Sequence, residues 1–167
     1  MFCDTSLVYY WYIKFLKLLL VTERTTKMTK EKKELVLFII WAQSVIATLG
    51  SLFFSEVMQF IPCELCWYSR ILMYPLVIIY GVALFKKEVT VALPGMILSG
   101  IGTVVATYHY LIQKIPALQA AGDSCGVIPC TTEYINYFGF VTIPFLALTA
   151  FVVIFCLHLV VLLKKGE

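Results

Sequence analysis

Four long apolar stretches constrain the fold of this chain more than any other feature of its 167 residues. They cover residues 35–54, 67–85, 89–113 and 142–163. Each is close to the roughly 20 apolar residues that a helix needs to cross a bilayer. Because lipid cannot pair backbone N–H and C=O groups, such spans are helices. The sequence therefore predicts an all-α membrane protein, a bundle of four transmembrane helices.

The composition agrees with this class of protein. The chain is 61% hydrophobic and 14% charged, whereas soluble domains carry about 25% charged residues. The spans and their connections take up most of the chain and leave no room for a separate soluble domain. The net charge of +3 does not indicate a nucleic-acid partner, because the basic residues flank the apolar stretches instead of forming a patch with aromatic residues.

The basic residues also predict the orientation, since Lys and Arg favour the cytoplasmic side of a membrane. With the N-terminus, the turn at 86–88 and the tail at 164–167 inside the cell, only Arg70 and Lys114 lie near the outer side. We therefore expect a multi-pass protein of the plasma membrane with both termini in the cytoplasm. Its two outer loops carry one cysteine pair each, on the side where disulfides persist.

Residues 1–34 form a cytoplasmic or interfacial N-terminal segment in this scheme. The apolar run 7–21 is interrupted by two lysines and is short for a span, so an interfacial helix is one interpretation. Another is that translation starts at Met28, directly before a basic lead-in to the first span, so that residues 1–27 are not part of the native chain. We attach no function to them and assign the functional domain to residues 35–163.

The first cysteine pair lies where a polar turn enters the second apolar stretch. Cys63 and Cys66 are separated by two residues, a spacing that allows a tight, reducible disulfide. If Cys66 opens a helix, the positive N-terminal end of that helix favours its thiolate. Arg70 follows one turn later on the same face, where a cation stabilises both a thiolate and the negative charge on a reduced quinone oxygen. A structural disulfide, and an arginine that only reaches for lipid headgroups, are the alternatives.

The second pair, Cys125 and Cys130, lies in a polar stretch from about 114 to 137 in which glycine and proline break regular structure. This loop is long enough to move above the short first loop. Thiol–disulfide exchange proceeds by direct attack through mixed disulfides, so a mobile pair above a fixed pair can act as a relay. The two pairs predict an enzyme that passes electron pairs from thiols to a lipid-soluble acceptor. The resting pairing of the four cysteines stays open.

The site could include further groups: a histidine, a zinc ion or a covalent haem. His109, near the outer end of the third span, can donate a hydrogen bond or a proton to a quinone, or it can be a packed interfacial residue. Four cysteines can bind zinc, but all four would have to stay reduced on the oxidising side, so no metal is expected. Covalent haem is not expected either, because Trp67 and not histidine follows Cys66.

These residues resemble a known family. Four spans, Pro-Cys-Glu-Leu-Cys-Trp-Tyr at the start of the second span, an arginine four residues after the second cysteine, and Cys-x4-Cys in the second outer loop are similar to the DsbB family of disulfide-bond formation proteins. The details are most similar to its BdbC-type, Gram-positive branch. The resemblance covers about residues 30–165. The short spacing from Cys125 to Cys130 departs from the widely separated pair of Gram-negative DsbB proteins, so the extent of loop movement does not carry over.

The resemblance implies a quinone-coupled thiol oxidase. Its partner would be an extracytoplasmic thioredoxin-like oxidase of the BdbD or DsbA type, and its acceptor the membrane quinone pool, with menaquinone expected. By analogy with the family, Cys125 forms the mixed disulfide with the partner. Cys130 then exchanges with Cys63 and leaves Cys66 as a thiolate beside the quinone. The arginine and the histidine described above would bind that quinone.

Two alternative functions stay open. A vitamin K epoxide reductase-like protein is also a helical bundle with a Cys-x-x-Cys at the membrane edge, although in that family the motif lies late in the chain. A non-enzymatic membrane adaptor would hold the same cysteines as structural disulfides, whatever the redox state of the quinone.

Overall fold

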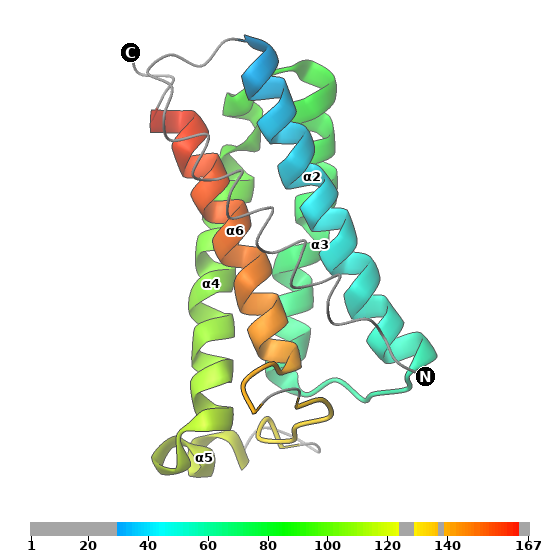
Figure 1. Ribbon diagram of the computed structural model, residues 1–167, viewed down its shortest axis with the longest axis vertical. Coiled ribbons are helices and arrows are strands. Elements are labelled where there is room, and N and C mark those ends of the chain that lie inside the picture. The colour runs from blue at the N-terminus through cyan, green and yellow to red at the C-terminus, as the bar shows by residue number, and fades with distance from the viewer. Residues whose placement is uncertain (1–29, 124–128, 137–138, 164–167) are drawn as a thin grey trace.

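The computed structural model describes residues 30–123, 129–136 and 139–163, and its regular structure there is helical (Figure 1). In chain order the elements are α2 (Lys30–Leu52), η1 (Phe53–Val57), α3 (Glu64–Lys86), η2 (Val89–Ala92), α4 (Leu93–Lys114), α5 (Pro116–Asp123) and α6 (Ile143–Leu163). Four segments are long and apolar enough to cross a membrane: α2 with η1, α3, η2 with α4, and α6. The predicted all-α architecture with four spans is confirmed.

Two helices begin before the apolar stretches that predicted them. α2 starts within the charged lead-in, and α3 starts at Glu64. Lysine and glutamate are good helix formers, so the loss of hydrophobicity does not mark the helix boundary. Cys66 consequently lies in the first turn of α3, which corrects its expected loop position, whereas Cys63 and Cys130 lie in connecting segments. Cys125 falls outside the described residues.

The four long helices pack around one apolar core. Buried side chains come from every one of them, among them Ile40 of α2, Leu76 of α3, Ala106 of α4 and Ile154 of α6. α4 and α6 are in close contact at Gly102, where a Cβ atom would overlap the ring of Phe151. Because hydrophobicity does not drive helices together in lipid, small residues that allow such contact are a main source of packing energy.

A buried polar pair joins α3 to α6 in the half of the bundle where both helices end. The Tyr80 hydroxyl and His158 Nδ1 are 2.9 Å apart and hydrogen-bonded, and both side chains are fully buried. Hydrogen bonds between helices stabilise bundles in lipid, where water is not available as a partner. This pair lies far from Cys63, Cys66 and Cys130.

Both cysteine-bearing connections lie at the other end of the bundle (Figure 1). The connection from η1 to α3 carries Cys63, and the segment that precedes α6 carries Cys130. The two are in direct contact, because the ring of Tyr134 stacks on that of Phe60 with the centroids 4.8 Å apart. The fold therefore brings the two regions predicted to share one side of the membrane together.

Candidate active site

Cys63 is the N-cap residue of α3, and Cys66 is the third residue of the helix, in its first turn. The Cys63 backbone is extended (φ −71°, ψ 172°), and its carbonyl accepts a hydrogen bond of 3.1 Å from the N–H of Trp67. The Cys63 thiol donates a hydrogen bond to Cys66 Sγ over 3.1 Å. The two sulfurs thus face each other at a separation that a small side-chain movement can close into a disulfide.

The proton of this pair is held on Cys63. The hydrogen bond to Cys66, together with burial, raises the pKa of the Cys63 thiol to about 12, against a smaller opposing contribution from His109. Cys63 is only 7% exposed, so water does little to stabilise a charge on its sulfur. When the pair loses one proton, the negative charge therefore resides on Cys66, which makes Cys66 the better nucleophile.

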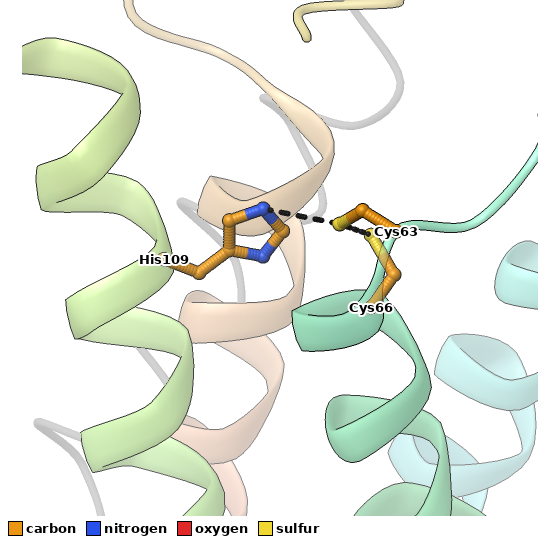
Figure 2. A group of neighbouring side chains, drawn as sticks. All are labelled: Cys63, Cys66 and His109. Carbon is orange, nitrogen blue, oxygen red and sulfur yellow. Dashed lines mark hydrogen bonds between the residues drawn. The ribbon is translucent and has the colours of Figure 1, made fainter. Parts of the chain in front are cut away.

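His109 approaches the pair from α4 (Figure 2). Its Nε2 lies 3.6 Å from Cys63 Sγ, and the side chain is 3% exposed. An imidazole in contact with a thiol can accept its proton or stabilise the thiolate. The sequence predicts this histidine only as a quinone ligand or a packed residue, and its contact with a cysteine is a structural finding.

The same three side chains have the spacing of a metal site. The ligand atoms of Cys63, Cys66 and His109 lie within 4.8 Å of one another. Structural zinc sites use four protein ligands, however. The four-cysteine zinc site considered from the sequence would include Cys125, which lies outside the described residues. A dithiol with an acid–base partner at the edge of a ligand-sized groove fits redox chemistry better than a closed structural site.

Arg70 lies one turn beyond Cys66, with its guanidinium between α2 and α3. Its Nη2 donates a hydrogen bond of 3.3 Å to the carbonyl of Ser51, and the guanidinium lies 5.6 Å from the centre of the Trp67 ring. A cation held by a backbone carbonyl and an indole face has a defined position. The half-buried side chain is therefore anchored to the protein rather than extended freely toward headgroups.

Cys66, Arg70 and His109 line one groove of about 770 Å³ among the helices. The rest of its wall comes largely from α2 and α6 and is mostly apolar; Phe54 and Phe151 contribute to it. Pockets for small organic ligands typically have about 300–1,000 Å³ and apolar walls with a few polar groups. Volume and lining both fit an organic ligand whose polar end meets the cation, the thiol and the imidazole.

Segment 129–136 lies over the cysteine pair. Its Cys130 is 1% exposed and lies close enough to Cys66 for charges on the two sulfurs to interact. The last turn of α4 anchors the segment, because Gln113 Nε2 donates a hydrogen bond of 3.2 Å to the Thr132 carbonyl. The described cysteine of the second pair is thus held near the first pair.

Sequence reasoning missed three residues that shape this site, namely Ser51, Gln113 and Tyr134. Gln113 lies one turn after His109 on the same helix face, and this spacing was a usable signal. Ser51 acts through its backbone carbonyl, which every residue has, so its side chain carried no signal.

An all-helical membrane bundle with a Cys-x-x-Cys dithiol at the start of one span, and a histidine beside the dithiol, has the architecture of a membrane thiol–disulfide oxidoreductase. The family model for the disulfide bond formation protein DsbB matches residues 33–161. The chain belongs to the DsbB family.

The relatives are of the BdbC type that the sequence analysis expected. The chain is 57% identical over 142 residues to the probable disulfide formation protein of Oceanobacillus iheyensis, with 84% of this chain and 97% of the relative covered. It is 48% identical over 131 residues to the disulfide bond formation protein C of Bacillus subtilis, with 78% and 93% covered. No solved structure matches the chain significantly.

Proposed function

We propose that this protein is a quinone-dependent thiol–disulfide oxidoreductase that reoxidises an extracytoplasmic thioredoxin-like thiol oxidase. In this way it supports disulfide formation in exported proteins. The observation that carries the proposal is the single groove shared by Cys66, Arg70 and His109. It lies between spans, where a lipid-soluble carrier can enter, and its volume suits an organic ring with the first part of a tail.

The two cysteine pairs have different reaction partners: Cys125 and Cys130 react with the thiol oxidase, and Cys63 and Cys66 pass the electrons to the acceptor in the groove. The reduced partner attacks the disulfide between Cys125 and Cys130 and forms a mixed disulfide with Cys125. The released Cys130 thiolate attacks Cys63 of the oxidised first pair, and Cys66 leaves as a thiolate. This order is supported by the burial of Cys130 beside the first pair and by the proton that Cys63 retains in preference to Cys66.

A bound quinone, with menaquinone expected from the resemblance, would accept two electrons and two protons. Arg70 supplies a fixed positive charge in the groove, which stabilises both the Cys66 thiolate and the negative charge that reaches the acceptor's oxygen. His109 lies beside Cys63 and also lines the groove, so it can donate a proton to the acceptor and take up a proton that the donor's thiols release.

The positive-inside rule gives the orientation of this reaction. The basic residues of the N-terminus, the α3–η2 turn and the C-terminal tail favour the cytoplasm, so the cysteine end of the bundle faces outward. We propose a plasma-membrane location with both termini inside. The domain comprises residues 35–163, and residues 1–27, outside the described residues, are assigned no role.

The test is quinone reduction by the protein in liposomes with a reduced thioredoxin-like donor. The wild type should reduce a menaquinone analogue, followed by its absorbance. Cys66→Ser should abolish this reduction, while the donor can still be trapped as a mixed disulfide on Cys125. Normal turnover by Cys66→Ser would refute the assignment, and cysteines that stay oxidised with or without quinone would indicate a structural adaptor instead.

A further inference from the structure

A second, much smaller cavity lies against the cysteine pair. It measures about 20 Å³ and adjoins the large groove, with which it shares Cys66 and His109. Cys63, Cys66 and His109 contribute to its wall, and segment 129–136 contributes the exposed residues Thr132 and Glu133. A cavity needs roughly 10–15 Å³ of this kind of volume to hold one water molecule, so there is room for one water and little more.

Two buried polar atoms without a partner belong to residues that line this cavity. Gln113 Oε1 and Thr142 Oγ1 have no hydrogen-bond partner among the described residues, and their side chains are 7% and 1% exposed. The amide nitrogen of Gln113 is already bonded to the Thr132 carbonyl, which leaves the oxygen for another partner. Buried polar groups are nearly always hydrogen-bonded, to protein or to ordered water. One water in this cavity would satisfy both atoms.

We propose that the small cavity is a water site, in which Gln113 and Thr142 bind one water molecule that passes protons to His109 during turnover. This inference rests on the proposed function. Gln113 Oε1 can only accept, so the water donates one hydrogen to it and keeps its lone pairs and second hydrogen for Thr142 and His109. Gln113 and Thr142 are thereby positioning residues, which act through the water.

The need for this route follows from the proton count. The two thiols of the donor lose two protons and two electrons, and the acceptor takes up the two electrons and the two protons. His109 is 3% exposed and lines both cavities, so it lies between the small cavity and the groove. After it gives one proton to the acceptor it must regain one. In the proposed exchange Cys63 is bound in a disulfide, first with Cys66 and then with Cys130, and has no proton to give, so the water supplies the proton. An O–H bond breaks as the N–H bond forms, and the water regains a proton released by the thiols of the donor.

The water site can be tested without any enzymatic activity. Thr48 provides a matched control, because its Oγ1 is also buried without a partner among the described residues but lines neither cavity. Replacing an unsatisfied buried hydroxyl by an isosteric methyl group should stabilise a protein. Thr48→Val should therefore raise Tm. Thr142→Val removes a hydrogen-bond partner of the water, so its Tm should lie a few degrees below that of Thr48→Val. Equal Tm values for the two variants would mean a dry cavity and would overturn the proposal.

The relay is tested by quinone reduction in liposomes. Thr142→Val should lower kcat about tenfold, within the range of general acid–base effects, and should increase the solvent isotope effect on kcat in D2O. The quinone KM should stay within twofold, because Thr142 does not line the groove. Thr142→Ser should restore kcat. A kcat unchanged in Thr142→Val, or equally low in both variants, would overturn the relay. A wild type that reduces no quinone would refute the proposed function, and the melting comparison would still decide the water site.

Discussion

The hydroxyl of Tyr134 donates a hydrogen bond of 3.1 Å to the carbonyl of Ile61. The bond joins the segment that carries Cys130 to the short connection that leads into α3. The Tyr134 ring also stacks on Phe60 in the same connection. One tyrosine therefore couples the positions of the two cysteine-bearing segments, and Cys63 follows Ile61 by only two residues.

Tyr134→Phe should remove the hydrogen bond and keep the ring stack. A hydrogen bond contributes about 0.5–1.5 kcal/mol net, so we expect transfer from the protein donor to slow roughly two- to tenfold. Quinone reduction driven by a small dithiol that acts directly on Cys63 and Cys66 should not change. Stopped-flow measurements with both donors check this. An unchanged rate with the protein donor would show that the hydrogen bond from Tyr134 to Ile61 does not position the two cysteine-bearing segments for exchange.

Arg70→Ala should chiefly raise the quinone KM, because it removes the fixed positive charge from the groove. Loss of a charge-assisted interaction of about 1.5–3 kcal/mol corresponds to roughly a ten- to hundredfold higher KM. Arg70→Lys is the matched control: it keeps the charge but not the geometry at Ser51 and Trp67, so we expect an intermediate KM. If Arg70→Ala lowers Tm and leaves KM unchanged, the arginine is structural.

Cys63 should react with iodoacetamide only as its thiolate forms. With its pKa raised to about 12 by the hydrogen bond to Cys66 and by burial, the alkylation rate should keep rising about tenfold per pH unit beyond pH 9.0. Peptide mass spectrometry, restricted to molecules in which Cys66 is unmodified, measures this rate. Cys66→Ala removes the hydrogen bond that contributes most to the raised pKa of Cys63. The alkylation rate of Cys63 should then reach its plateau at a lower pH. A plateau near pH 9.0 with Cys66 present would contradict the assignment of the proton to Cys63.

The same pKa shift predicts how stability depends on pH. The folded protein holds the Cys63 proton more tightly than the unfolded chain, whose thiol titrates near 9.0. The resulting contribution to stability is complete below pH 9.0 and is lost as pH rises toward 12. The Tm of the reduced wild type should therefore fall more steeply above pH 9.0 than that of Cys63→Ala.

Tyr80→Phe should destabilise the bundle without affecting catalysis. It leaves His158 Nδ1 without its hydrogen bond, and such bonds within membranes contribute on average about 0.6 and at most about 1.7 kcal/mol. Tyr74→Phe on the same helix is the control, because the Tyr74 hydroxyl has no partner among the described residues. Unfolding in SDS should separate the two variants, and equal destabilisation would contradict a role for the pair. Quinone reduction should persist, since Tyr80 lies roughly 20 Å along α3 from Cys66.

The four spans could be predicted because each apolar stretch has the length of one bilayer crossing and charges mark its ends. The start of α3 was less predictable. Glu64 is charged yet helical, and so Cys66 belongs to the helix while Cys63 caps it. The position of Arg70 one turn beyond Cys66 followed from helical spacing alone.

The contact between His109 and Cys63 could not be predicted in the same way. The position of a residue within its apolar stretch gives its depth along its own helix, but the contact also depends on how α4 is rotated and how it crosses α3. Gln113 and Thr142 line one cavity for the same reason, since Gln113 belongs to α4 and Thr142 directly precedes α6. The roles assigned to Cys125 and Cys130 stay predictions.

Phe151 rests on the bare backbone of Gly102 and also forms part of the groove wall. Because position 102 has no side chain, the phenyl ring can sink toward α4 and leave the groove wide. The width of the groove is thus set by a residue that does not line it. A side chain at position 102 would push the ring toward the groove and narrow the space for the apolar part of a ligand.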